Sequence, residues 1–521
     1  MPRDLASSLA RGLRAAGVRT IFGVPGGGPN LDMIGSAEAV GIDFVLTHGE
    51  TAACIMAGSY GHLTRTPGAA VVTRGPGLMS AGNGLAQATL DRFPLVLLSD
   101  TVSHADADRI AHQRLDQVQV AAPVTKWSGR LGTRDPDEVI RAAATLAGRP
   151  PAGAVHVAFD PTVPGDPPPE LPAVPETDAT ALERARRMCA GAERPLIVLG
   201  LDAARYAERM RELLASLDCP ILVTYEAKGT VPESWSSYAG LFTGAAVERP
   251  LLEQSDLVLG VGLDSVEPMP GPWTYEAPVV MLHSHPVETT FFGTPELVVG
   301  SYDECLPQLI GALRPVWPAK TGEEARRRAV ADLEIPTAGL SPHDVVRTAH
   351  QTMGDSLLTV DAGAHMLLAM PLWETDEPDS VLISNGLATM GFALPAAIGA
   401  ALARPERRVL CLTGDGGLGM VLAELETVAR LGLDITVIVL NDLALTLIRL
   451  KQREAQGGDG AVVYGSMDFA GIADSMGVPG TVVHDADGLR RALAEPVSGP
   501  RLVDARIDPS AYPHVMRVTR G

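Results

Sequence analysis

Short runs of aliphatic and β-branched residues alternate with longer Ala- and Leu-rich stretches along the whole chain of 521 residues. Such short runs are typical of buried strands, and the longer stretches have the apolar spacing of helices. Strands that alternate with helices form parallel sheets covered by helices on both faces. We therefore predict an α/β protein with doubly wound parallel sheets. The predicted strands lie within 18–24, 44–49, 68–75, 93–100, 195–200, 219–225, 256–262, 278–284, 357–363, 407–415, 434–442 and 500–508.

Proline-rich stretches divide this pattern into three blocks. Residues 161–176 contain seven prolines, which favours an extended, semi-rigid linker. A second and looser boundary begins with RPVWPAKTGEEARRR at 314–328. The predicted domains are therefore 1–163, 177–330 and 340–521, each long enough for a sheet of its own. Ligands of such sheets bind beyond the carboxyl ends of the strands, so functional residues are expected where strands end.

The charge balance narrows the choice of partners. The chain has 42 Lys and Arg against 62 Asp and Glu, a net charge of −20. Nucleic acid and anionic membrane surfaces repel such a chain, so neither is expected as a partner. The stretch 1–18 is predicted as an amphipathic helix rather than a signal peptide. Five cysteines without C-x-x-C spacing favour a reducing compartment, and we expect a cytoplasmic protein without a disulfide framework.

A glycine loop, CLTGDGGLGM, carries the clearest chemical signal. Gly414, Gly416 and Gly419 form G-x-G-x-x-G, a dinucleotide-binding fingerprint, but Asp415 stands between the first two glycines. A carboxylate about 4 Å from a pyrophosphate costs roughly 4 kcal/mol at an effective dielectric constant of about 20. Either the fingerprint is accidental or a positive charge separates the two groups.

The loop belongs to a predicted strand–helix–strand unit at 408–442, with its helix at 419–433. A right-handed crossover brings Asp415 and Asp442, which close the two strands, to the same sheet edge. Three interpretations of this pair stay open. The two acids bind a divalent cation such as Mg²⁺ that bridges to a diphosphate held at the helix start. Alternatively, Asp442 serves a dinucleotide and Asp415 is unexplained, or Asp415 is a turn or capping residue and Asp442 begins a loop.

Longer segments resemble the thiamin-diphosphate (ThDP) enzymes of the acetolactate synthase and 2-oxo acid decarboxylase superfamily. The resemblance covers essentially the whole chain. It implies a pyrimidine-binding, a central and a pyrophosphate-binding domain, in that order. The segments that carry it are FGVPGGGPNLDMI (22–34), THGETAACIMAGSYGHLT (47–64), TRGPGLMSAGNGLAQATLDRFPLVLLSD (73–100), SNGLATMGFALPAAIGAAL (384–402), GDGGLGMVLAELETVARLGL (414–433) and LNDLALTLIRLKQ (440–452).

This resemblance implies a diphosphate and metal site in the third domain. Asp415 and Asp442 match the side-chain ligands of Mg²⁺, and Ala444 matches a ligand through its carbonyl. Most members of the family have Asn at the position of Asp442, and the extra charge here either tightens Mg²⁺ binding or strains the diphosphate. Met390 matches the bulky residue that props the cofactor in its bent form. The residues that match the diphosphate-binding positions are Gly363, His365, Gly414, Gly416 and Gly417.

The first domain is implied to hold the pyrimidine ring. Glu50 matches the glutamate that hydrogen-bonds a ring nitrogen and stabilises the imino tautomer, which takes the proton from the thiazolium C2. Gly27 matches a residue whose carbonyl meets the 4′-amino group, and Pro76 and Gly77 match the lining of the pyrimidine site. On its own, Glu50 is equally an acid placed at a helix start.

The type of reaction is inferred from one segment. Related decarboxylases often carry paired histidines where this chain has His112 and Gln113, which resemble acetolactate synthases, in which Gln helps to orient the acceptor. We therefore expect a carboligase that decarboxylates a pyruvate-like 2-oxo acid and transfers the resulting acyl carbanion to a carbonyl acceptor. The alternatives are a simple 2-oxo acid decarboxylase and, more remotely, a non-catalytic ThDP-binding protein or a dinucleotide-dependent oxidoreductase.

Leu443, Leu445 and Leu447 are aliphatic where pyruvate-specific relatives have polar or aromatic groups, which points to a bulkier donor or acceptor. Arg449 and Lys451 either meet a substrate carboxylate or form a solvated helix face.

Three further expectations concern the rest of the molecule. In the family, the Glu-bearing domain of one subunit faces the diphosphate domain of another, so a homodimer or homotetramer is implied. The segment 263–271 stands where FAD-containing relatives have an RFDDR-like sequence, so FAD is not expected. The histidine pair in HSHP at 283–286 resembles a metal-binding pair, but we interpret it as a turn at the end of a strand.

Overall fold

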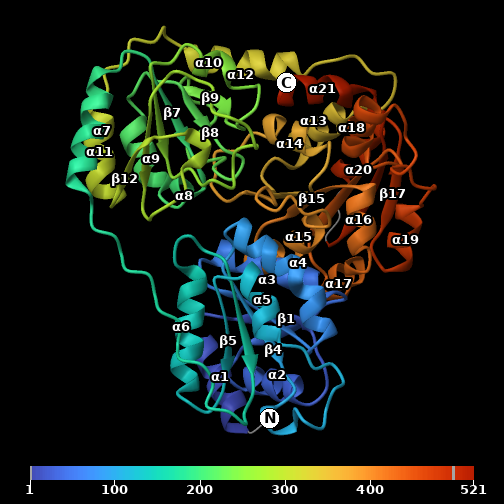
Figure 1. Cartoon of the computed structure of the whole chain (residues 1–521). Helices are drawn as coiled ribbons and strands as arrows, with labels where there is room; N and C mark the ends of the chain where they lie inside the picture. Colours follow the sequence, from blue (N-terminus) through green and yellow to red (C-terminus); the bar gives the residue numbers. More distant parts are fainter. Residues whose placement is uncertain (1–2, 496–498) are drawn as a thin grey trace.

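The computed structural model describes residues 3–495 and 499–521 and contains three six-stranded sheets, each made of parallel strands (Figure 1). The strand orders are β2-β1-β3-β4-β6-β5, β12-β11-β10-β7-β8-β9 and β14-β13-β15-β16-β18-β17. Helices cover both faces of each sheet, so the predicted α/β class with three doubly wound parallel sheets is confirmed. None of the helices described is both long and apolar enough to cross a membrane.

The first sheet comes from the N-terminal part of the chain, coloured blue to teal in Figure 1. Its strands are β1 (Thr20–Val24), β2 (Asp43–Leu46), β3 (Gly68–Val72), β4 (Leu95–Asp100), β5 (Trp127–Leu131) and β6 (Ala154–Phe159). Its helices are α1 (Arg3–Ala15), α2 (Pro29–Ala39), α3 (Glu50–Thr64), α4 (Pro76–Leu90), α5 (Gln117–Ala121) and α6 (Pro136–Gly148).

The second sheet, green in Figure 1, follows the linker. Its strands are β7 (Pro195–Leu199), β8 (Ile221–Val223), β9 (Tyr238–Leu241), β10 (Leu257–Val261), β11 (Val279–His283) and β12 (Glu296–Val299). Its helices are α7 (Ala179–Gly191), α8 (Leu201–Ala204), α9 (Ala207–Leu214), α10 (Arg249–Leu252), α11 (Tyr302–Ala312) and α12 (Thr321–Asp332).

The third sheet is orange to red in Figure 1. Its strands are β13 (Leu357–Val360), β14 (Val381–Ile383), β15 (Val409–Gly414), β16 (Ile435–Asn441), β17 (Gly480–Val483) and β18 (Arg501–Arg506). Its helices are α13 (Pro342–Met353), α14 (Met366–Leu372), α15 (Ala393–Ala403), α16 (Asp415–Val421), α17 (Glu424–Leu431), α18 (Thr446–Gln456), α19 (Phe469–Ser475), α20 (Ala486–Ala494) and α21 (Tyr512–Arg520).

One local prediction needs correction. The helix predicted at 419–433 begins earlier, at Asp415, and is divided into α16 and α17. Gly416, Gly417 and Gly419 are therefore part of α16 instead of preceding the helix, and Gly414 ends β15. The stretch 314–328 includes the start of α12, which packs against β9 of the central domain. In contrast, the proline-rich stretch 161–176 has neither helix nor strand, as predicted, and runs along the outside of the molecule (Figure 1).

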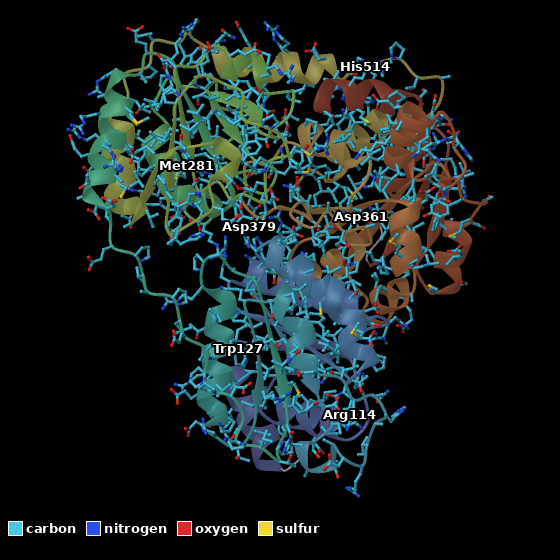
Figure 2. All side chains as sticks on the ribbon, in the orientation of Figure 1. Arg114, Trp127, Met281, Asp361, Asp379 and His514 are labelled. Carbon is cyan, nitrogen blue, oxygen red and sulfur yellow. The ribbon has the colours of Figure 1, made fainter. Side chains whose placement is uncertain are left out.

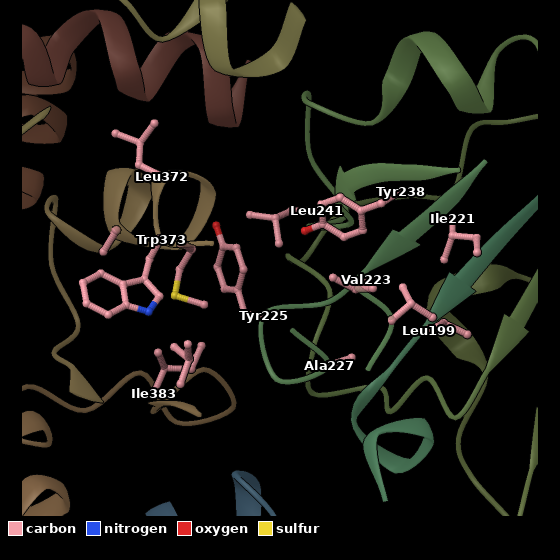
Figure 3. Packing of buried hydrophobic residues seen from close by; sticks show 14 of the residues in the cluster. Leu199, Ile221, Val223, Tyr225, Ala227, Tyr238, Leu241, Leu372, Trp373 and Ile383 are labelled. Carbon is pink, nitrogen blue, oxygen red and sulfur yellow. The ribbon is translucent and has the colours of Figure 1, made fainter. Parts of the chain in front are cut away.

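Continuous hydrophobic cores join the third sheet to both of the others. One core includes Tyr225 and Leu241 of the second sheet region and Trp373 and Ile383 of the third (Figure 3). The other is formed where α3 packs against α15. At this crossing a Cβ on Gly399 would lie 2.4 Å from the Met56 carbonyl oxygen, so only glycine permits the close approach of the two helices. This packing fixes how the first and third domains sit in one chain.

Candidate functional site

A cavity of about 230 Å³ lies where β13, β15 and β16 end. Parallel sheets bind ligands at this edge because the connections to the following helices diverge there. All nine site residues predicted in the third domain line this cavity, namely Gly363, His365, Met390, Gly414, Asp415, Gly416, Gly417, Asp442 and Ala444. The sequence segments that supply them are far apart along the chain, so it is the sheet that brings them together.

Asp415 and Asp442 meet because their strands are neighbours. Gly414 of β15 pairs with Leu440 of β16, so both acids follow directly at the same edge. The Asp415 carboxylate accepts hydrogen bonds from the Gly416 N–H at 2.7 Å and the Ala444 N–H at 3.2 Å. Burial, and then the neighbouring Asp442, raise the pKa of Asp415 to about 6.

The carboxylate of Asp442 accepts a hydrogen bond from the Thr446 hydroxyl. Burial raises the pKa of Asp442 as well. A buried and a half-buried carboxylate that repel each other are stabilised by a bound cation, and their oxygen atoms are the ligands that Mg²⁺ prefers. These oxygen ligands therefore fit a magnesium ion. If Asp415 were only a capping residue, the proximity of a second acid would stay unexplained.

His365 adds an unpartnered polar atom to the cavity. The side chain is 5% exposed, and its Nε2 has no hydrogen-bond partner in the described structure. Burial lowers the pKa of His365 to about 4, so the ring is neutral at pH 7. A neutral imidazole has one N–H and one lone pair, so Nε2 can face a polar ligand atom as donor or as acceptor according to the tautomer. The residue thus suits the polar part of a ligand that enters the cavity.

The glycines keep the floor of the cavity open. A Cβ on Gly416 would lie 2.7 Å from a Leu445 methyl and 3.2 Å from the Met390 methyl, so a side chain here would fill the space. A Cβ on Gly417 would lie 2.3 Å from Asp361 Oδ2. Backbone N–H groups can therefore come close to a ligand, as phosphate-binding loops require.

Asp361, a residue that sequence reasoning did not select, holds the parts of this site together. It is 1% exposed and follows β13. Its carboxylate accepts hydrogen bonds from the N–H groups of Ala362, Gly391 and Phe392 and from the Thr413 hydroxyl. Figure 2 labels Asp361 within the third domain. It thereby connects the segment that carries Met390 to the end of β15.

The site residues predicted in the first domain gather at its own sheet edge. Glu50 is the first residue of α3, and its Oε1 would lie 3.5 Å from a Cβ on Gly77. Gln113 packs against the same turn, since its Cβ is 3.0 Å from the position of a Cβ on Gly75. Gly27 lies in the loop after β1 with open space around it. Pro76 begins α4, and His112 is exposed beside Gln113.

The two groups of residues do not meet within this chain. Among the described residues, none from the first domain lines the cavity in the third. Instead, Glu424 of α17 accepts hydrogen bonds from the His48 N–H at 3.0 Å and the Gly49 N–H at 3.1 Å. These bonds anchor the residues just before Glu50 to the back of the third domain. The chain therefore presents two separate half-sites.

Other residues at the cavity were also missed. Tyr512 and Arg520 of α21 line it, although nothing in their local sequence resembles a binding motif. Arg449, considered as a substrate contact, is paired with Asp459 through bonds of 3.1 and 2.8 Å. Lys451 is exposed on α18. All five cysteines are free and buried, as the absence of a disulfide framework predicts.

Comparison with known proteins agrees with the order of the three domains. The chain matches family models of the thiamine pyrophosphate enzymes, namely the N-terminal TPP binding domain at residues 3–120, the central domain at 182–306 and the C-terminal TPP binding domain at 361–505. These matches, together with the fold, define a ThDP-dependent enzyme.

The relatives narrow this class. The catabolic acetolactate synthase of Raoultella terrigena is 31% identical over 97% of this chain and 95% of its own. The acetolactate synthase of Bacillus subtilis is 28% identical over 94% and 91%, and the large subunit of isozyme 3 from Escherichia coli is 28% identical over 99% and 97%. The chain belongs to the acetolactate synthase-like family of ThDP enzymes. The dinucleotide interpretation of the glycine loop is therefore set aside.

We expect the substitution Asp361→Asn to loosen the cavity. The amide NH₂ of Asn would face an N–H or O–H group that now donates a hydrogen bond to the carboxylate. The free energy of unfolding should therefore fall by about 1–3 kcal/mol. The affinity for ThDP should fall several-fold because the Met390 segment is no longer fixed. Urea unfolding and calorimetric titration with ThDP measure the two effects. Asp355→Asn, an exposed acid before β13, serves as the control, and equal behaviour of the two variants would contradict this role of Asp361.

Proposed function

We propose that the protein is a ThDP- and Mg²⁺-dependent carboligase that decarboxylates a pyruvate-like 2-oxo acid and joins the acyl unit to a carbonyl acceptor. The observation that carries this proposal is the pair Asp415 and Asp442 in a cavity lined by all the third-domain residues that match the family. The names of the relatives, acetolactate synthases, support carboligation. A simple decarboxylase and a non-catalytic binding protein are not favoured by any of these findings.

The residues of the third domain would hold the diphosphate and the metal ion. Asp415, Asp442 and the Ala444 carbonyl would bind Mg²⁺. The Gly417 N–H would face the phosphate oxygens, as would that of Gly416 once it is released from its 2.7 Å bond to Asp415 Oδ1. His365 would present its unpartnered Nε2 to the same group. Gly363 and Gly414, both next to the His365 ring, keep the space that this ring needs. The chemistry that ThDP supplies when bound is a nucleophilic carbon and an electron sink for decarboxylation.

Glu50 would act in the first domain as the proton-holding group. Its carboxyl would share a proton with the ring nitrogen of the aminopyrimidine, in a pocket that excludes water. Gly27, Pro76 and Gly77 would shape the space for this ring. Met390 would support the bent conformation from the opposite domain. Gln113, next to the turn that holds Gly77, would orient the acceptor, with His112 beside it.

A complete site would require two copies of the chain. The first-domain residues do not line the cavity of their own chain, and exposed apolar side chains surround both half-sites. Met420 and Tyr464 are 59% and 43% exposed beside the cavity, and Met79 is 56% exposed on α4 near Gly77. Such clustered apolar residues are typical of surfaces that a partner covers. We therefore propose a homodimer or homotetramer, located in the cytoplasm.

The acceptor pocket would be apolar. Leu445 and Leu447 line the cavity together with Ile448. Aliphatic walls favour substrates with hydrocarbon side chains, because burial of each methylene is favourable by about 0.8 kcal/mol. A donor or acceptor larger than pyruvate would therefore fit this enzyme. FAD is not part of the proposal.

Replacing Glu50 by Gln tests the proton role. We expect release of CO₂ from 2-oxo acids to fall by at least about 10²-fold, the usual contribution of acid–base catalysis. ThDP should still bind, since Gln keeps the shape and one acceptor. Glu38→Gln, an exposed acid on α2, should keep full turnover. Product analysis by NMR with pyruvate and with longer 2-oxo acids shows whether a 2-hydroxy ketone forms. Full activity of the Glu50→Gln variant would refute the role.

The two acids should differ when each is replaced by Asn. At Asp415 both oxygens accept backbone N–H bonds, so an amide NH₂ there opposes a donor. We expect the Mg²⁺ concentration for half-maximal activity to rise at least about tenfold in Asp415→Asn. Asp442→Asn keeps an oxygen for the metal and should change this value less than the other variant does. Activity measured over a range of Mg²⁺ concentrations gives this value for each variant. An unchanged Mg²⁺ requirement in Asp415→Asn would exclude Asp415 as a ligand.

Mixing two impaired variants tests whether the site is shared, provided that the assay uses a Mg²⁺ concentration that supports the wild type but leaves Asp415→Asn nearly inactive. In a dimer of Glu50→Gln with Asp415→Asn chains, one site has both changes and the other has neither. Random association of equal amounts should therefore restore about a quarter of wild-type activity, because half of the dimers are mixed. If both half-sites acted within one chain, no activity would return. Co-expression with two affinity tags, followed by assay of the protein before and after selection for both tags, measures this.

A further inference from the structure

A second group of potential metal ligands lies in the central domain, away from the cavity described above. Asp202 is in α8, directly after β7, and His283 is the last residue of β11. His285 follows two residues later. Because β7 and β11 flank β10 on either side, their ends converge at the carboxyl edge of the second sheet. One ligand atom from each of the three side chains lies within 4.8 Å of the others.

The two histidines are buried, and three of their four ring nitrogens have no hydrogen-bond partner in the described structure. His283 is 1% exposed and His285 is 8% exposed. Both ring nitrogens of His283 and Nε2 of His285 lack a partner at hydrogen-bond geometry in the described structure. His156 shows the usual arrangement, since its two nitrogens bond the hydroxyls of Ser99 and Ser128 at 2.8 Å each. Buried polar atoms without partners are costly, and a bound ion would remove that cost.

The neighbouring residues fix the tautomer of His285. The Ser284 hydroxyl donates to Asp202 Oδ2 at 2.6 Å, and its oxygen lies 3.1 Å from Nδ1 of His285. Since the hydroxyl proton is engaged by Asp202, the Ser284 oxygen accepts the Nδ1–H of His285. The lone pair of His285 is then on Nε2, the unpartnered atom. Ring nitrogens of metal-ligating histidines are commonly fixed by such a bond on the other nitrogen.

The carboxylate of Asp202 is held by a second donor. Tyr302 donates its hydroxyl to Asp202 Oδ2 at 2.8 Å, and burial raises the pKa of Tyr302, so this proton stays in place. One carboxylate oxygen therefore carries two hydrogen bonds, which position the group. This is the usual support of a carboxylate ligand.

The charges around the cluster suit a divalent cation. Burial favours the neutral form of the two imidazoles, which is the form that binds metal. Asp202 supplies one negative charge. The cations that face the histidines are Arg92 and Arg205, and Arg92 is neutralised by Asp264 through bonds of 2.7 and 2.9 Å.

We propose that Asp202, His283 and His285 bind a divalent transition metal ion of the Zn²⁺ type. Two imidazoles and one carboxylate favour Zn²⁺ and similar ions over Mg²⁺, which prefers oxygen ligands. Bonds of about 2.0 Å to a tetrahedral Zn²⁺ place its ligands roughly 3.3 Å apart, so side-chain rotation closes the group around the ion. A fourth position is left for water. The ion would tie the end of β7 to the end of β11 and stabilise the central domain.

The site is independent of the proposed catalytic function, and its test keeps the two apart. The full-length protein is first loaded with ThDP and Mg²⁺, so that the site at Asp415 and Asp442 is filled. Zn²⁺ is then titrated in competition with a chromophoric chelator, and bound zinc is counted by elemental analysis after dialysis. X-ray absorption at the zinc edge reports whether imidazole ligands are present. We expect one Zn²⁺ for each chain, with two imidazoles.

The variants His283→Gln, His285→Gln and Asp202→Asn should each weaken Zn²⁺ binding at least about tenfold. His343→Gln, a change of another buried histidine whose Nε2 bonds the Leu333 carbonyl, should bind Zn²⁺ as the wild type does. Zn²⁺ should also raise the Tm of the wild type and not that of His285→Gln, because a ligand that binds the native state stabilises it.

Three results would overturn the proposal. They are wild-type protein that binds no Zn²⁺, a zinc spectrum without imidazole ligands, and unchanged affinity in the His283 and His285 variants. Should a variant fail to fold, the wild-type titration and spectrum decide alone. The result of the Glu50→Gln activity test, whether activity is lost or kept, does not affect this outcome, because the two sites share no residue.

Discussion

The main constraint on the third-domain cavity is the repulsion between the buried carboxylate of Asp415 and the half-buried carboxylate of Asp442. Asp415 and Asp442 follow neighbouring strands whose register leaves no freedom to separate them. Burial and mutual repulsion raise the pKa of Asp415 to about 6, so the charged pair is costly without a cation. Two features of the surroundings fit a bound ligand. Nε2 of His365 has no hydrogen-bond partner, and glycines stand where any side chain would fill the space. A bound cation with its diphosphate would remove this electrostatic cost. The charged pair is therefore what a binding site for such a ligand would need.

The nine residues that the resemblance indicated in the third domain line one cavity, and the strand pattern explains why they meet. The residues that bind at the edge of a parallel sheet are those that follow strands, and β13, β15 and β16 are long apolar runs that are easy to recognise. The strands that it missed are β5, β6, β9, β12, β14 and β17. Apart from β6, each of these lies at an edge of its sheet. Edge strands are short and partly exposed, as in β12 and β17, so their hydrophobic signal is weak.

Residues that act through contacts distant in the sequence could not be predicted in this way. Asp361 appeared as part of a DAG segment, but its four hydrogen-bond donors come from three different segments and are visible only in the folded chain. The same holds for Asp202, which is 81 residues before His283 and meets it only because β7 and β11 flank one strand. The histidine pair was correctly placed at a strand end. The third ligand, Asp202, joins the pair only through the order of strands in the sheet. The proposal of a metal site therefore needed the folded structure.

The separation of the two half-sites follows from how the domains of one chain pack. The α3 helix, which begins at Glu50, is used along its length to pack against α15. Its first turn is anchored by Glu424 through the N–H groups of His48 and Gly49. Moving Glu50 to the cavity of the same chain would break both contacts and expose a core that includes Met56 and Phe392. Under the proposed function, a second chain would bring its own Glu50 to the cavity without that cost. The intrachain core would thus make association the less costly way to complete the site.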